Sequence, residues 1–157
     1  MPPQRRRALV ALFALALLLV SITACSGTAA DPGTLVVLAH APSGEVRFMQ
    51  LGSGKITDRI QVGGEPGHVL RDPGRGRVYV TDTAGDSVAV VDVLNRRITE
   101  RVRVGREPRF AALAPDGARL YVTIAGEDSL AIVDTNTLEV VGRVPTGNRP
   151  AGVAVSS

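Results

Sequence analysis

The feature that most constrains this chain is a direct repeat with a constant offset, in which position 77 corresponds to position 119. Residues 77–115 match residues 119–157 at 14 of 39 positions, and residues 35–76 match residues 77–118 at 10 of 42, both without a gap. A constant, ungapped offset requires the same local structure in every unit. The sequence therefore predicts three successive copies of one supersecondary unit, over 35–76, 77–118 and 119–157.

Each unit contains short β-prone runs separated by Gly, Pro, Asn and Asp. In the middle unit these runs are 77–81, 87–92, 98–104 and 109–114. Such runs, bounded by turn residues, predict strands. Four strands in about 42 residues is the size of one β-propeller blade. The run 88–91 has no polar alternation, which is typical of strands covered on both faces. We therefore expect an all-β fold of propeller-type repeats.

The order of predicted strands is three, then two sets of four, then a last strand that ends near Val155. These twelve strands would make about three blades, whereas closed propellers have about 4 to 8. Two explanations remain open. The chain is a fragment of a longer ring, or its last strand completes the first blade of a partner in a homodimer of six blades.

Composition and charge limit the classes of partner. Aromatic residues are only 3% of the chain and Trp is absent, so Val, Leu, Ile and Ala must form the core. The net charge of +3 comes from Arg5, Arg6 and Arg7, and the basic and acidic residues after Cys25 balance. The sequence gives no electrostatic reason to expect a nucleic-acid partner.

Residues 1–24 have the layout of a secretory signal peptide. Three arginines at 5–7 precede an uninterrupted apolar run over 8–20, and small residues follow. The run is shorter than the roughly 20 residues that a membrane-spanning helix needs. Residues 1–24 are therefore interpreted as a signal, and residues 34–157 as the repeat domain.

Residues Ile22, Thr23, Ala24 and Cys25 resemble the lipobox of bacterial lipoproteins. The resemblance implies cleavage between Ala24 and Cys25 and a lipid on the Cys25 thiol. The small, polar residues 26–33 predict a flexible tether, so 25–33 is the lipidated cysteine with its tether. Acyl chains on this residue would hold the protein at a membrane, outside the cytoplasm or in the periplasm of the cell envelope. The alternatives are an uncleaved anchor with a free thiol and a plain signal peptide cut elsewhere.

Two tetrapeptides, 79–82 (YVTD) and 121–124 (YVTI), begin a pattern that resembles the YVTN family of β-propeller repeat proteins. The following segments 86–92 and 128–134 and the turn at 114–117 fit the same pattern. The resemblance covers nearly all of 35–157 and implies a propeller fold. The sequence departs from it at Asp82 and Ile124, where Asn is usual, and over 37–40.

Candidate chemistry is sparse. Neither His40 nor His68 has a second histidine or a carboxylate at a metal-ligand spacing, so we expect no metal site and no catalytic residue. Glu65, His68, Glu107 and Arg109 belong to the connections between blades, where propellers generally bind ligands, and they are the candidate binding residues. The competing interpretation of these residues is ordinary loop charge.

Asp92 and Asp134 close strands at the same place in two units. Bonds from their side chains to the turn backbone explain these aspartates better than acid–base chemistry does.

Three functions are compatible with the sequence. The first is a membrane-anchored binding or scaffolding module, without a cofactor, for a protein or a small ligand. The second is a fragment or relative of a propeller enzyme, because relatives of this fold include lactonases and quinoprotein-like dehydrogenases, but one inactive as it stands. The third is a partial gene product without activity of its own.

Overall fold

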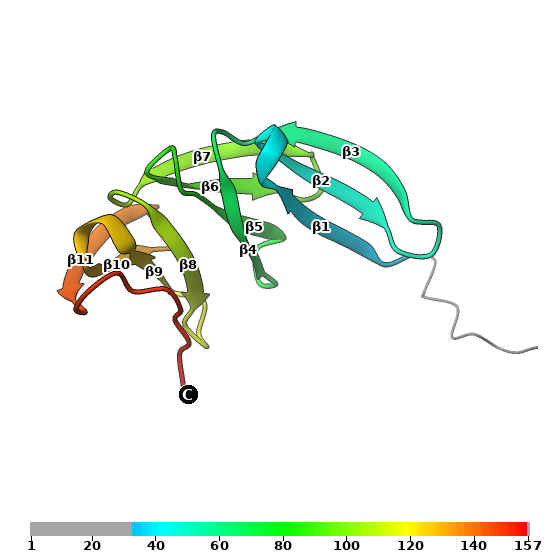
Figure 1. The fold of residues 1–157 in the computed structure, drawn as a ribbon. Helices are drawn as coiled ribbons and strands as arrows, with labels where there is room; N and C mark the ends of the chain where they lie inside the picture. Colours follow the sequence, from blue (N-terminus) through cyan, green and yellow to red (C-terminus); the bar gives the residue numbers. More distant parts are fainter. Residues whose placement is uncertain (1–32, 157) are drawn as a thin grey trace, which may run out of the picture. The chain divides into compact units, whose positions relative to one another are not determined.

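The computed structural model describes residues 33–156, which form eleven strands in three antiparallel sheets (Figure 1). The predicted signal peptide over 1–24, Cys25 and nearly all of the predicted tether lie outside the described residues. Within 33–156 no helix is both long and apolar enough to cross a membrane.

Each sheet is built from consecutive strands, so neighbours in the sequence are neighbours in the sheet. The first sheet consists of β1 (Leu35–His40), β2 (Glu45–Gln50) and β3 (Lys55–Gln61), with a 3-10 turn, η1 (Ala41–Ser43), between β1 and β2. The second consists of β4 (Pro66–Asp72), β5 (Arg77–Asp82), β6 (Ser87–Asp92) and β7 (Arg97–Arg103). The third consists of β8 (Pro108–Leu113), β9 (Arg119–Ile124), β10 (Ser129–Asp134) and β11 (Glu139–Pro145), with η2 (Ala125–Glu127) after β9.

The strand predictions are confirmed for the middle unit, where each predicted run agrees with β5, β6, β7 or β8 to within one residue at either end. The prediction of a twelfth strand is wrong. Residues 150–156 form no strand, and Figure 1 draws them as a red coil after β11. A strand exists only where a neighbouring strand accepts its backbone hydrogen bonds, and among the described residues none does so here.

The boundaries of the sequence units and of the sheets differ by one strand: the unit 77–118 contains β5 to β8, whereas the second sheet consists of β4 to β7. Each repeat unit supplies three neighbouring strands of one sheet and then a crossover, and the crossovers of the first two units begin the next sheet. The three crossovers are anchored alike, by bonds from Val62 N to Gly44 O (2.8 Å), Val104 N to Asp86 O (3.2 Å) and Thr146 N to Asp128 O (3.0 Å). A glycine with positive φ, a conformation that suits a residue without a Cβ, follows each anchor: Gly63, Gly105 and Gly147.

The core consists of two clusters that share the middle sheet. Along β6, Val88 and Val90 belong to one cluster, which includes residues of β9 and β10, whereas Ala89 and Val91 belong to the other, with residues of β2. All four are fully buried. Successive side chains of a strand point to opposite faces, so the middle sheet is covered on both sides. This confirms the interpretation of the run 88–91.

The repeated aspartates stabilise turns, as predicted. Asp92 Oδ1 accepts hydrogen bonds from Leu94 N (2.9 Å) and Asn95 N (3.0 Å), and Asp134 Oδ1 accepts them from Asn136 N (2.8 Å) and Thr137 N (3.2 Å). These backbone donors favour the charged form, so they lower the pKa of both carboxyl groups.

Candidate functional site

The candidate site lies where β4 and β8, called the inner strands below, begin. The two strands contact each other, and each starts at a proline that follows a charged residue. The backbone N–H before each proline, and before Pro150, donates to an aspartate Oδ1: Glu65 to Asp82 (3.0 Å), Glu107 to Asp86 (3.2 Å) and Arg149 to Asp128 (2.9 Å). An aspartate therefore accepts the backbone N–H before each of these prolines; Asp86 and Asp128 are equivalent positions of the repeat, whereas Asp82 is a different one.

Glu107 brings two arginines together. Its Oε2 accepts a hydrogen bond from Arg149 Nη2 at 2.8 Å and lies 3.7 Å from Arg109 Nη2. The Arg149 side chain is 60% exposed and the other two are 42% exposed. Ion pairs this exposed contribute little to stability. Their effect is positional, because one carboxylate holds two partly exposed guanidinium groups near each other. The three residues carry a net charge of +1.

An aromatic pair lies beside these charges. The rings of His68 and Phe110 have centroids 5.2 Å apart and are tilted by 47°. The amide of Ala111 donates to His68 Nδ1 at 3.2 Å. This bond requires Nδ1 to be unprotonated, so in the neutral ring the proton is on Nε2. Burial disfavours the charged form and lowers the pKa of His68, which keeps the ring neutral near pH 7.

Thr81 connects His68 of the aromatic pair with Arg109 of the charged group through hydrogen bonds. Its Oγ1 accepts a hydrogen bond from His68 N (2.9 Å) and donates one to Arg109 O (3.0 Å), so one hydroxyl joins β4, β5 and β8. In the next sheet the amide of Phe110 donates to Thr123 Oγ1 at 3.0 Å. Residues 68 and 110 thus sit at equivalent irregularities of the two inner strands, where the ladder register shifts.

A cavity of about 240 Å³ opens next to this cluster. Its lining comprises Arg109, Phe110, Ala125, Arg149, Pro150 and Ala151. The lining combines two cations, an exposed ring and small apolar groups. Such a surface suits a small ligand that carries an acidic group and an apolar body.

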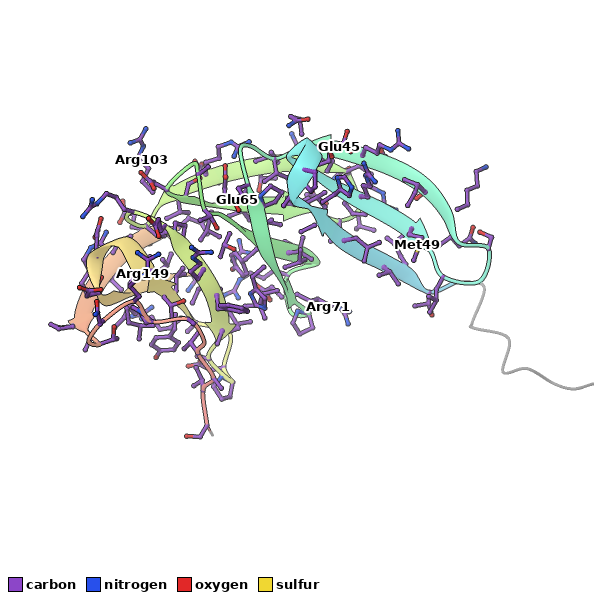
Figure 2. The ribbon with its side chains drawn as sticks, viewed as in Figure 1. Glu45, Met49, Glu65, Arg71, Arg103 and Arg149 are labelled. Atoms are coloured by element: carbon purple, nitrogen blue, oxygen red, sulfur yellow. The ribbon has the colours of Figure 1, made fainter. Side chains whose placement is uncertain are left out.

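The structure brings together three of the four predicted binding residues: His68, Glu107 and Arg109. No hydrogen bond or ion pair in the described part of the chain joins the Glu65 side chain to them. Sequence reasoning missed Phe110 and Arg149. The repeat held the signal for both, because Phe110 is equivalent to His68 and Arg149 to Glu107. Figure 2 labels Glu65 and Arg149 on their separate crossovers.

A larger cavity, of about 430 Å³, lies apart from this cluster, between β1 and the start of β5. Leu35, Val37, Val78, Val93 and Leu94 give it an apolar lining, to which Gly76, Arg71 and Arg77 also contribute. Over residues 33–156, no group of three or more His, Cys, Asp and Glu side chains is placed to hold a metal ion.

No family model and no curated protein sequence matches the chain. Solved structures do. Hydrazine synthase of Kuenenia stuttgartiensis is 25% identical, with a TM-score of 0.69 over 74% of this chain and 34% of that chain. The dihydro-heme d1 dehydrogenase NirN in complex with DHE is 23% identical (TM-score 0.64, 74% and 25% covered). Apo AztD from Citrobacter koseri is 19% identical (TM-score 0.63, 75% and 34% covered).

These neighbours are propeller-type proteins. The antiparallel sheets of this chain, one of three strands and two of four, match the blades of such proteins. The chain therefore has a β-propeller-type fold, of which residues 33–156 form an open part and not a closed ring. It spans about a third or less of the length of the solved chains named above.

Proposed function

We propose that this chain is a YVTN-type propeller module, lipid-anchored through Cys25 outside the cytoplasm, that binds a ligand where its inner strands begin. The observation that carries the binding role is the Glu107 carboxylate, which holds Arg149 at 2.8 Å beside Arg109 and the cavity of about 240 Å³. Guanidinium groups with free donors recognise carboxylates and phosphates. The proposed ligand is a small molecule or a peptide segment with an acidic group.

The bonding of the site favours binding over catalysis. A general base needs a free acceptor near the reacting proton. Nδ1 of His68 already accepts from the Ala111 amide, and the Glu107 carboxylate is paired with Arg149. Both groups are used to hold the site together, so we propose no catalytic role for them. The alternative, an inactive relative of a propeller enzyme, has no such observation in its favour.

The binding role can be tested with N-acetylphenylalanine, which combines a carboxylate with a ring. NMR titration of the full chain should move the signals of His68, Arg109, Phe110 and Arg149 first. Arg109→Gln should weaken binding about 3-fold to 10-fold, because one charge-assisted hydrogen bond is lost. Arg97→Gln, at an exposed position on β7, is the matched control and should leave the affinity unchanged.

The uncharged amide of the same compound separates recognition of the acid from adsorption of the ring. Equal affinity for the acid and the amide, or shifts centred outside the inner strands, would contradict the proposal. High salt should weaken binding of the acid because the arginines are exposed.

The anchor is tested separately, by growing a bacterial host that expresses the chain with an alkyne-labelled fatty acid. The chain should carry the label and sediment with membranes. Cys25→Ser should lose both properties, whereas Ser26→Ala should keep them. An unlabelled chain would refute the anchor and leave the binding proposal intact.

A further inference from the structure

The first sheet lacks one strand of the repeat. With the same repeat offset, β1, β2 and β3 are equivalent to β5, β6 and β7. β5 pairs with β4 on one side and β6 on the other, and β9 pairs likewise with β8 and β10. Among residues 33–156, however, β1 pairs with β2 alone. The position that an inner strand would take beside β1 therefore holds no described strand.

The opposite end of the described chain carries an inner-strand segment without a sheet. Pro150 is equivalent to Pro66 and Pro108, the first residues of β4 and β8. The crossover before it is complete, since Thr146 N and Arg149 N bond to Asp128 O (3.0 Å) and Asp128 Oδ1 (2.9 Å). Residues 150–155 therefore follow the same kind of crossover as the inner strands β4 and β8, yet they pair with no described strand.

We propose that residues 150–155 of one copy pair with β1 of a second copy, and that the exchange is reciprocal. The register follows from the two observed inner pairings, Val69 with Val80 and Ala111 with Val122. Shifted by the repeat, it places Val153 opposite Leu38. The next two positions place Ala154 opposite Val37 and Val155 opposite Val36.

The two segments are chemically compatible. Neither 35–39 nor 150–155 contains a charged residue, so no like charges meet. Leu38 and Val155 are 38% and 36% exposed, and pairing would cover both. Reciprocal exchange is an isologous two-fold contact, the commonest symmetry of oligomers. The three sheets that residues 33–156 form in each of two copies would together give six blades, inside the usual range of about 4 to 8.

The proposed pairing of 150–155 with β1 lacks one hydrogen bond that the observed pairings of β4 with β5 and of β8 with β9 contain. Thr81 and Thr123 accept the amide hydrogen bonds of His68 and Phe110 where the inner strands are irregular. The equivalent residue of β1 is Ala39. Ala39→Thr supplies the hydroxyl, so it should lower the dissociation constant of the dimer about fivefold.

The mass of the full chain in a nonionic detergent, measured by light scattering over a range of concentrations, tests the proposal. We expect twice the chain mass, with Ala39→Thr remaining dimeric at lower concentration. A chain that ends after Arg149 should be monomeric with an unchanged circular dichroism spectrum, because the removed segment makes no ladder within its own chain. A wild-type chain that is monomeric throughout would overturn the proposal.

Cross-linking tests the register and does not depend on how the shortened chain folds. Two differently tagged proteins, Leu38→Cys and Val153→Cys, are mixed and oxidised. The predicted pair should form a mixed disulfide, since directly opposed residues lie within disulfide reach. Leu38→Cys mixed with Ala154→Cys should not, because a shift of one residue turns the side chain to the other face.

Wild-type chains, whose one cysteine is Cys25, report any background. Equal cross-linking by Val153→Cys and Ala154→Cys, or by neither, would overturn the proposed register. A dimer that persists after removal of 150–157 would overturn the exchange itself. Pro150 and Ala151 belong to both sites, because they also line the cavity beside Arg109. The dimer tests read mass and cross-linking without ligand, and the ligand test reads NMR shifts and the Arg109→Gln affinity in the full chain, so failure of one proposal is distinguishable from failure of the other.

Discussion

The two junctions between consecutive sheets differ in the side chains that fill them. Between the second and third sheets, Tyr79 is 1% exposed, and its hydroxyl donates to Asp72 Oδ2 at 3.2 Å. Arg77 Nη2 donates to Tyr79 Oη and to Thr135 O, both at 2.5 Å. Between the first and second sheets, Val37 replaces the tyrosine and Leu35 the arginine, and both line the cavity of about 430 Å³.

The two junctions carry different side chains at two equivalent positions of the repeat. The ladders of β1 with β2 and of β5 with β6 have the same register, so these side chains point to the same face of their sheets, although no described strand takes the place of β4 beside β1. A tyrosine and an arginine at the two positions fill the space and bond across it. Two aliphatic residues leave space with apolar walls. Substitutions at these positions therefore test how far each junction depends on its side chains.

The largest effect is expected from Tyr79→Ala, which removes a fully buried ring and leaves Asp72 and Arg77 without their shared hydroxyl. Truncation of a buried aromatic residue costs about 3–5 kcal/mol of unfolding free energy. Tyr121→Ala, at the equivalent position of the third sheet, should cost less because that residue is only half-buried. Urea denaturation of both variants checks this. Equal losses of unfolding free energy in the two variants would show that Tyr79 contributes no more to stability than Tyr121 does.

Asp72→Asn should have the next largest effect. The carboxylate is 2% exposed and lies 3.2 Å from Arg77 Nε and 3.4 Å from Arg75 Nη1. Removing its charge leaves Arg77, 16% exposed, without its counterion. The expected loss is about 2–3 kcal/mol. Asp116→Asn, in an exposed turn, is the control and should stay within about 0.5 kcal/mol. If Asp72→Asn lost no more unfolding free energy than Asp116→Asn, a stabilising role of Asp72 at the second junction would be contradicted.

Alkaline pH should weaken the second junction. Burial raises the pKa of Tyr79 to about 12, although the nearby Arg77 lowers it in part. The unfolded chain loses this proton near pH 10 and the folded chain does not. The stabilisation is thus complete below pH 10 and is lost as the pH rises through 12, about 2–3 kcal/mol in all.

The chain has two tyrosines and no tryptophan, so absorbance at 295 nm follows the tyrosines alone. A component that titrates near pH 12 should disappear in Tyr79→Phe and persist in Tyr121→Phe. Persistence of this component in Tyr79→Phe would assign it to the other ring and refute the prediction.

The smallest effect is a gain. Val37→Tyr places the residue of the second junction into the cavity of the first, and filling a cavity commonly adds about 0.5–2 kcal/mol. Val36→Tyr is the control, because its side chain points to the opposite face of β1. A higher melting temperature for Val37→Tyr alone would confirm that the cavity is accessible space. A lower one would mean that neighbouring groups cannot accommodate the ring.

The sequence predicted the repeat, the strand positions and the turn aspartates because these depend on local chemistry that recurs from one unit to the next. It could not predict that residues 150–156 form no strand, because strand formation depends on a neighbouring sheet that local chemistry does not reveal. Three of the four candidate binding residues meet, since the repeat places them at equivalent crossovers. Arg149 was missed because its role comes from a contact with Glu107, one full repeat away in the sequence.

The one-strand phase difference between sequence unit and sheet has a consequence for how such a chain can change length. Each described four-stranded sheet is one continuous stretch of the chain, 66–103 or 108–145, although it spans the boundary between two sequence units. A segment of one repeat length within the four-stranded sheets contains the four strand positions of one blade whatever its starting point, so duplicating it preserves the order of the strands. Unequal recombination between repeats would therefore lengthen or shorten the array by whole blades, wherever the breakpoints fall.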